Sequence, residues 1–259
     1  MSKLKKAMEK AKAARKVVRH DFVERPEAVP EALTITYSET EIVTVSENTL
    51  KQNKIVSLFH EKAMTDQLKI LRAQVINRMK QLEGNSLLVT SADHGAGKTL
   101  TAINLAVSIS QEVHHTVLLV DANLRAPSVH KYFGLEGERG LANYLLGEAE
   151  LPELLVNPGI ENLVILPGGK PLPNSAELLG ASKTASMVKE MKARYPERFI
   201  IFDSPSLLSC ADALVFSHLM DGILLVVEAE KTPEKDLKQA MELLKERTII
   251  GTVLNKARG

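Results

Sequence analysis

Residues 87–99 read Leu-Leu-Val-Thr-Ser-Ala-Asp-His-Gly-Ala-Gly-Lys-Thr, an apolar run followed by a turn rich in glycine. The turn matches the phosphate-binding pattern Gly-x-x-x-x-Gly-Lys-Thr, with Ala92 at the position of the first glycine. Residues 100–111 have the apolar spacing of a helix, whose positive dipole end would face the turn. The order of strand, turn and helix therefore predicts a loop that binds phosphate.

Each residue type in this turn suits phosphate binding. Gly95 and Gly97 let the backbone wrap closely around phosphate oxygens with its N–H groups turned inward. Lys98 supplies a cation for the β- and γ-phosphates, and Thr99 supplies a hydroxyl ligand for Mg²⁺. The alternative is a glycine-rich turn that only permits tight packing. We expect the nucleotide to contact the whole loop, namely Asp93, His94, Gly95, Ala96, Gly97, Lys98, Thr99 and Leu100.

Two further apolar runs each end in an aspartate, Val117-Leu-Leu-Val-Asp121 and Phe199-Ile-Ile-Phe-Asp203. Because the carboxyl ends of parallel strands open at one edge of a sheet, we expect both carboxylates beside the phosphate loop. There Asp121 and Asp203 would hold Mg²⁺ together with Thr99. Either aspartate alone is also a common helix cap. Three strand ends with complementary chemistry favour a site for a nucleoside triphosphate and Mg²⁺.

Apolar runs of strand length alternate with helical patterns from residue 86 onward. Runs of nearly continuous Ile, Leu and Val are typical of strands that are covered on both faces. The sequence thus predicts an α/β fold of the P-loop NTPase type, with a mostly parallel sheet flanked by helices. The expected strands are Leu87–Thr90, Thr116–Val120, Leu163–Leu166, Phe199–Phe202, Ile223–Val227 and Thr248–Leu254.

The composition is that of an ordinary globular protein. The chain has 259 residues, with 33 basic and 32 acidic side chains and a formal net charge of +1. Hydrophobic residues make up 44% of it, which excludes wholesale disorder. A single cysteine, Cys210, excludes an internal disulfide framework and a cysteine-based metal cluster. No apolar run approaches the ~18 residues of a membrane-spanning helix, so we expect a cytoplasmic protein.

The N-terminal part differs in charge from the rest. Residues 1–20 carry eight basic side chains and one acid, with apolar residues at helical spacing, and predict a basic helix. This helix would either only aid solubility or dock onto anionic lipid or an acidic partner. Residues 21–58 show no sustained period, so we expect a flexible linker there. The expected domains are 1–58, basic helix and linker, and 59–259, nucleotide binding.

A further helix is predicted between this linker and the phosphate loop, with Gly84 ending it. Its apolar residues recur at steps of four and three, which places them on one face. They are Met64, Leu68, Leu71, Val75, Met79 and Leu82.

From about residue 60 to 259 the chain resembles the bacterial tyrosine kinases of the exopolysaccharide type, the BY-kinases similar to CpsD and CapB. The segments that carry this resemblance follow the phosphate loop in order: Asp121-Ala-Asn-Leu-Arg-Ala-Pro127, Gly140-Leu-Ala-Asn-Tyr-Leu-Leu-Gly147, Leu166-Pro-Gly-Gly169 with Pro173-Asn-Ser-Ala-Glu-Leu-Leu179, and Asp203-Ser-Pro-Ser206. The Lys-rich opening, residues 2–11, also resembles the kinases of exosortase-linked exopolysaccharide loci.

The resemblance implies a Mg·ATP-dependent protein-tyrosine kinase that regulates the polymerisation, chain length and export of an exopolysaccharide. In this role Lys98 and Asp203 bind the phosphates and Mg²⁺, Asp121 activates the acceptor tyrosine, and Arg125 helps to order the site. In the similar ParA- and MinD-like proteins an asparagine after the last strand contacts adenine, which implies that role for Asn255. A simple cap of the strand end is the alternative.

The resemblance also implies partners. Family members form rings through Glu-x-x-Arg-x-x-Arg, and Asp66-x-x-Lys69-x-x-Arg72 is a charge-preserving variant. This variant implies a homo-oligomer that is held less tightly than the family's rings, because lysine cannot form the two parallel hydrogen bonds that arginine forms with a carboxylate. The alternative is that these charges lie on an ordinary solvated helix face. A Wzz-like polysaccharide co-polymerase in the membrane is the implied partner, which would keep the chain peripherally at the inner face of the plasma membrane. We expect no nucleic-acid partner.

Three positions depart from the family pattern. Asn123 replaces the second acid of the Asp-x-Asp-x-Arg motif and cannot act as a charged metal ligand or a base. His94 replaces the usual proline of the loop. The C-terminal tyrosine cluster of the family is not found in the residues before 259. Tyr37, in the expected linker, is therefore the most easily presented acceptor.

These departures leave a second hypothesis open, an ATP-binding switch or scaffold with little catalysis that gates the same polysaccharide machinery. A ParA/MinD-type ATPase is the third hypothesis. It is disfavoured because those proteins carry a signature lysine early in the loop, where Asp93 and its neighbours offer none.

Overall fold

A computed structural model of the protein describes residues 41–59, 62–194 and 197–257, all within the unit Leu33–Gly259. The basic helix expected at 1–20, the first half of the expected linker and Tyr37 lie outside the described residues. Among the helices that are described, none has the length and apolar character needed to cross a membrane.

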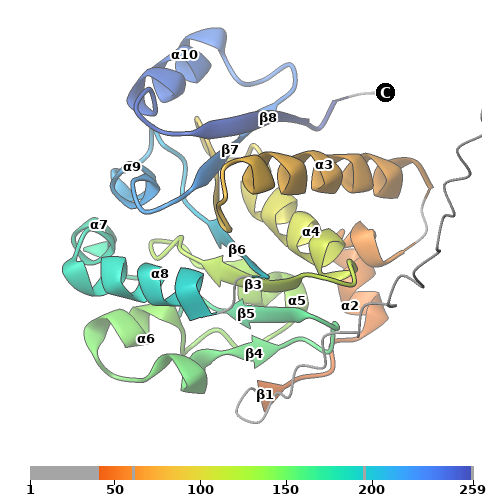
Figure 1. The fold of residues 1–259 in the computed structure, drawn as a ribbon, viewed down its shortest axis with the longest axis vertical. Coiled ribbons are helices and arrows are strands. Elements are labelled where there is room, and N and C mark those ends of the chain that lie inside the picture. The colour runs from red at the N-terminus through yellow and green to blue at the C-terminus, as the bar shows by residue number, and fades with distance from the viewer. Residues whose placement is uncertain (1–40, 60–61, 195–196, 258–259) are drawn as a thin grey trace, which may run out of the picture. The chain divides into compact units, whose positions relative to one another are not determined.

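An eight-stranded sheet forms the centre of this unit, in the order β1-β4-β5-β3-β6-β2-β7-β8 (Figure 1). Neighbouring strands are parallel except for β4 and β5, which confirms the expected mostly parallel sheet. All six predicted strands form. The strands are β1 (Glu41–Ile42), β2 (Ser86–Ser91), β3 (Thr116–Asp121), β4 (Val156–Asn157), β5 (Leu163–Leu166), β6 (Arg198–Asp203), β7 (Gly222–Glu228) and β8 (Ile249–Asn255).

Alternate residues of the central strands point into two hydrophobic cores, one on each face of the sheet. In β3, Leu118 and Val120 lie in the first core, and Val117 and Leu119 lie in the second. Figure 1 shows helices on both sides of the sheet. The first core is covered by α6 (Leu141–Leu146), η2 (Leu151–Leu154), α7 (Ser175–Leu179), α8 (Ser182–Arg194), α9 (Asp212–Ser217) and α10 (Glu234–Leu243). The second is covered by α2 (Glu47–Gln52), η1 (Val56–Leu58), α3 (Lys62–Gln81), α4 (Lys98–Ser110) and α5 (Val129–Phe133).

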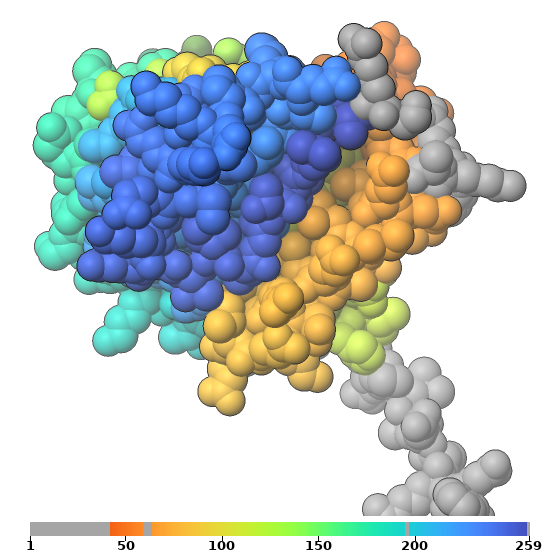
Figure 2. Space-filling view, turned by 90° about the horizontal axis from the view of Figure 1, so that it is seen from above, coloured from red at the N-terminus to blue at the C-terminus, as the bar shows by residue number. Residues whose placement is uncertain are grey.

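Helix α3 is the helix predicted before the phosphate loop, but its apolar stripe is buried only in part. Val75 and Met79 are buried in the second core, whereas Met64 and Leu82 are 56% and 43% exposed. The helix packs against α4 and β8, and Figure 2 shows its surface beside the C-terminal part of the chain.

The end of α3 is built differently from the prediction. Glu83, not Gly84, adopts the left-handed conformation, with φ of +51°. Gly84 is needed for space, because a Cβ at this position would lie 2.4 Å from Asp221 Cβ. This close approach brings the start of β2 against the loop that leads into β7.

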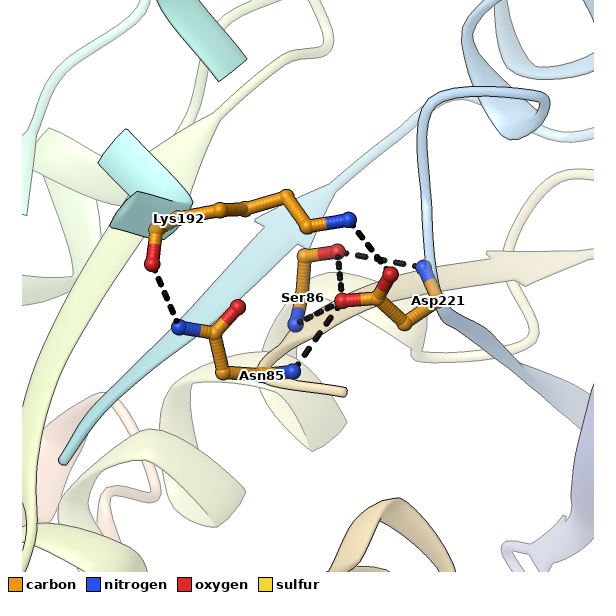
Figure 3. Close-up of polar contacts among 4 residues, drawn as sticks. All are labelled: Asn85, Ser86, Lys192 and Asp221. Atoms are coloured by element: carbon orange, nitrogen blue, oxygen red, sulfur yellow. Dashed lines mark hydrogen bonds and ion pairs between the residues drawn. The ribbon is translucent and has the colours of Figure 1, made fainter. Parts of the chain in front are cut away.

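Next to this contact, a polar network surrounds Asp221 at the amino end of β2 (Figure 3). Asp221 Oδ2 accepts hydrogen bonds from the backbone N–H groups of Asn85 (3.0 Å) and Ser86 (3.1 Å) and from the Ser86 hydroxyl (2.8 Å). Lys192 of α8 pairs with Asp221 Oδ1, and Asn85 Nδ2 donates to the Lys192 carbonyl at 3.1 Å. These bonds stabilise the ionised carboxylate and hold the pKa of Asp221 below its usual value, despite partial burial.

Residues 41–58 form ordered structure, so the prediction of a linker up to residue 58 is wrong for this part. β1 pairs with β4, and Leu50 and Ile55 are buried in the second core. The side chain of Asn104, on α4, accepts the backbone N–H of Val56 at 2.9 Å. These elements are too short to show a period, and tertiary contacts determine their structure. Residues 41–58 are therefore part of the same compact unit as the central sheet.

Candidate active site

The predicted phosphate loop connects β2 to α4. Gly95 and Gly97 have φ of +81° and +88°, so both predicted glycines occupy the left-handed region that disfavours a side chain. Gly97 caps α4, which begins at Lys98, two residues earlier than predicted. Lys98 is buried in the first turn, and Thr99 is half-buried beside it. The loop backbone thus has the conformation from which successive N–H groups can surround an anion.

The outer side of the loop is held by the chain after β6. Leu207 and Leu208 donate their N–H groups to the carbonyls of Ser91 (2.9 Å) and Ala92 (3.1 Å). Ala92 is buried and does not have a positive φ, so alanine fits at the position of the first glycine. His94, in the proline position, is exposed, and its N–H donates to Asp93 Oδ1 at 2.7 Å.

Asp121 and Asp203 lie side by side at the carboxyl ends of β3 and β6, where they are register partners. β6 also pairs with β2, which brings this strand end to the phosphate loop. Both carboxylates are fully buried. The structure therefore brings together the two strand-end acids and the loop, as the sequence predicts.

Asp203 accepts the Thr99 hydroxyl at 2.7 Å through Oδ2, while Oδ1 is buried and has no hydrogen-bond partner in the described structure. Burial, and then the neighbouring Asp121, raise the pKa of Asp203 from 3.8 to about 8, although Lys98 and the Thr99 hydroxyl lower it. A buried carboxylate oxygen without a donor is the type of ligand that a hard divalent cation prefers. Thr99 and Asp203 thus fit a Mg²⁺ site.

Asp121 has a different environment. Its Oδ2 accepts the N–H groups of Ser128 (2.7 Å) and Val129 (2.9 Å), and its Oδ1 accepts that of Asn123 (3.2 Å). Burial raises the pKa of Asp121 to about 6, and these backbone bonds and Lys131 limit the rise. Asp121 therefore caps the start of α5, as one of the two roles considered from the sequence requires, and it also lies beside Asp203.

Arg125 does not contact the two acids but pairs with Asp212 at the start of α9. Its Nε lies 3.0 Å from Asp212 Oδ1, and this pairing raises the pKa of Arg125. Asp212 is fully buried and also accepts the Ser175 hydroxyl of α7. Arg125 thus joins the loop after β3 to α7 and α9. Sequence reasoning assigned no role to Ser175 or Asp212, although Ser175 lies in the segment 173–179 that carries the family resemblance.

Asn255, at the end of β8, contacts the phosphate loop, with Nδ2 donating to the Ala96 carbonyl at 2.8 Å. The next residue, Lys256, donates from Nζ to the Gly95 carbonyl at 2.8 Å. Sequence reasoning missed Lys256, and its position directly after Asn255 was the available signal.

Of the three residues of the expected ring motif, two are exposed. Asp66 and Lys69 form a 3.5 Å pair on the surface of α3. Arg72 is directed inward, since it donates to the Ser108 carbonyl (2.8 Å) and pairs with Glu112 (2.6 Å) at the end of α4. It stabilises the packing of α3 on α4 within one chain.

The chain is similar to known kinases in sequence. Residues 86–253 match the family model described as "AAA domain". The putative tyrosine-protein kinase CapB of Staphylococcus aureus is 30% identical over 212 residues, which cover 80% of this chain and 92% of CapB. The tyrosine-protein kinase YwqD of Bacillus subtilis is 32% identical, over 79% of this chain and 86% of YwqD.

Solved structures agree with this. The kinase domain of the Escherichia coli tyrosine kinase ETK superposes with a TM-score of 0.73 at 25% identity, over 87% of this chain and 92% of that domain. MinD of Pyrococcus horikoshii, solved with Mg-ADP, gives a TM-score of 0.56 at 26% identity, over 66% of this chain and 69% of MinD. The expected P-loop NTPase fold of the ParA/MinD type is confirmed.

Proposed function

Since the chain belongs to the bacterial tyrosine-protein kinase family that includes CapB and YwqD, we propose that it is a Mg·ATP-dependent protein-tyrosine kinase of exopolysaccharide or capsule assembly. In this proposal the loop amides and Lys98 bind the β- and γ-phosphates. Asn255 contacts the adenine edge from the end of β8. Each of these residues borders the phosphate loop or lies in it, which supports a common ligand.

One observation carries the proposal: the buried Asp203 carboxylate binds the Thr99 hydroxyl and keeps a second oxygen without a partner in the described part of the chain. A Mg²⁺ held by Thr99 and Asp203, with Asp121 nearby, needs only one or two carboxylates, because phosphate oxygens and water complete its coordination. When bound, Mg²⁺ would offset the negative charge that develops on the phosphoryl oxygens.

Asp121 is the proposed general base for the acceptor tyrosine. With a pKa of about 6 it is mostly ionised at neutral pH and can accept the phenol proton as the oxygen attacks phosphorus. Its backbone bonds to Ser128 and Val129 keep the carboxylate in one orientation. Arg125, through Asp212, would keep the loop after β3 in place.

A second candidate function is an ATP-binding switch with little catalysis. It is favoured by the fact that both oxygens of Asp121 already accept backbone N–H groups, while Asn123 offers no replacement carboxylate. In that case the site would bind MgATP, and binding rather than phosphoryl transfer would signal to the polysaccharide machinery.

The remaining parts of the proposal concern partners. We propose a Wzz-like co-polymerase as the membrane partner that holds the protein at the inner face of the plasma membrane, and Tyr37 as an acceptor. For self-association, only Asp66 and Lys69 of the ring motif present exposed charges, because Arg72 is bound within the chain. A ring through this helix would therefore rest on fewer intermolecular ion pairs.

Incubation of the purified protein with labelled ATP and Mg²⁺, followed by phosphotyrosine detection, tests the two candidates. Lys98→Met should abolish labelling, and Lys170→Met, at an exposed position, is the matched control. Tyr37→Phe tests the acceptor. Labelled tyrosine supports the kinase, whereas binding of MgATP without any transfer supports the switch. Absence of nucleotide binding contradicts both.

A further inference from the structure

Lys256 lies between the end of β7 and the phosphate loop. Its Nζ donates to the Gly95 carbonyl at 2.8 Å and forms an ion pair with Glu228 Oε1 at 3.1 Å. The Glu228 side chain is only 11% exposed, and the backbone N–H of Glu228 is bound by the Thr232 hydroxyl at 2.9 Å. The ammonium group is therefore held on one side by a fixed strand end and on the other by the loop.

Asn255, the last residue of β8, and Lys256, the next residue, bind two consecutive carbonyls of the loop. Asn255 binds the Ala96 carbonyl, as Lys256 binds that of Gly95. Asn255 Oδ1 in turn accepts the Lys256 N–H at 2.9 Å. Lys256 has a φ of +58°, a left-handed conformation that is unfavourable for a non-glycine residue and persists only where the surroundings require it.

Binding a carbonyl also orients the N–H of the same peptide. In a planar trans peptide the C=O and the following N–H point in opposite directions. When Lys256 and Asn255 hold the carbonyls of Gly95 and Ala96, they turn the N–H groups of Ala96 and Gly97 to the other side. Those two amides are loop donors available to a phosphate.

We propose that Lys256, held by Glu228, is a positioning residue that presets the phosphate loop for binding; this rests on the nucleotide site proposed above. The loop contains two glycines with positive φ, and glycine has more accessible backbone conformations to lose than any other residue. A loop already held in the binding conformation loses less conformational entropy when phosphate binds. The residue acts through the loop backbone and does not touch the ligand.

Titration calorimetry with MgADP and with magnesium tripolyphosphate, which has no base or ribose, tests this inference. Lys256→Met should weaken both ligands by about tenfold, the effect of losing a charge-assisted hydrogen bond. Lys256→Arg should restore most of the affinity. Glu228→Gln should weaken both ligands by a smaller factor, and it carries the test if Lys256→Met does not fold. Lys245→Met, which removes an exposed pair with Glu242 on the surface, is the matched control.

The outcomes are distinguishable. Equal losses for the two ligands, at an unchanged unfolding temperature without ligand, support the inference. A loss for MgADP alone overturns it, because Lys256 would then contact the nucleoside. Affinities equal to those of the unchanged protein overturn it as well. Failure of the unchanged protein to bind MgADP would instead contradict the proposed nucleotide site.

Discussion

Replacing Asp203 by Asn should make the nucleotide-free protein more stable while removing its response to Mg²⁺. In the folded state the pKa of Asp203 rises from 3.8 to about 8 because the group is buried beside Asp121. About three pH units separate 3.8 from pH 7, and each is worth about 1.4 kcal/mol, so the carboxyl costs up to about 4 kcal/mol at neutral pH. Asn avoids this cost and can still accept the Thr99 hydroxyl.

The sign follows from linkage. A carboxyl whose folded pKa is raised destabilises the protein progressively as the pH rises from its unfolded pKa to its folded pKa. The gain in free energy of unfolding of Asp203→Asn over the unchanged protein should therefore grow between about pH 4 and pH 8. We expect a gain of about 2–4 kcal/mol at pH 7, which corresponds to an increase of about 5–15 °C in Tm for a unit of this size.

Thermal unfolding followed by circular dichroism from pH 4.5 to 8.5, with and without MgADP, measures both effects. The matched control is Asp221→Asn, and Figure 3 shows the contacts of Asp221. Asp221 directly precedes β7, whereas Asp203 is the last residue of β6. The pKa of Asp221 is lowered, so its stabilisation is present above the unfolded pKa and is lost as the pH falls. The free energy of unfolding of this variant should be lower by about 1.5–3 kcal/mol at pH 7, whereas that of Asp203→Asn should be higher.

A Tm of Asp203→Asn below that of the unchanged protein at pH 8 would refute this reasoning. A difference in Tm between the two proteins that does not change with pH would also refute it. So would an undiminished increase in Tm on adding MgADP, since loss of the carboxylate should weaken binding of the metal-bound nucleotide. A hundredfold excess of ligand over Kd raises stability by about 2.7 kcal/mol, which is well within reach of the measurement.

Three further predictions concern the loop and its supports. Asn123→Asp should speed phosphotyrosine formation if a second acid limits the rate, and an unchanged rate in the labelling assay would count against that account. Gly97→Ala should abolish MgADP binding in calorimetry, because φ is +88° and the new Cβ would lie 2.2 Å from Asn255 Nδ2. Asn104→Ala should lower the free energy of unfolding in urea by about 2–3 kcal/mol, because its side chain satisfies buried backbone groups; a loss below about 0.5 kcal/mol would contradict this.

The central sheet and the three strand ends could be predicted from the sequence because each rests on a local pattern. Continuous Ile, Leu and Val predicted the strands, and an acid or a glycine-rich turn directly after a strand predicted the site. Parallel pairing then brings Asp121 beside Asp203 without further information, as observed. For this reason the position of the proposed nucleotide site could be predicted from the sequence.

The contacts that hold the elements around the site in place could not be predicted in this way. Within residues 41–58, the turn η1 depends on Asn104, 48 positions after Val56, whose side chain accepts the N–H groups of Val56 and Ser57. No local pattern records such a contact. Arg72 likewise resembled an exposed charge in a motif, but its partners are the Ser108 carbonyl and Glu112 on the next helix.

The segment from α2 to η1 has a consequence for how the protein can be shortened. Asn53 of this segment donates to the Tyr132 carbonyl on α5 at 2.8 Å, while Asn104 binds the segment to α4. Trimming the chain at residue 58 would leave empty the space that Leu50 and Ile55 fill. It would also remove the hydrogen bonds that join this segment to α4 and α5, the two helices beside the proposed nucleotide site. A minimal folding version of this protein should keep every residue from 41 onward.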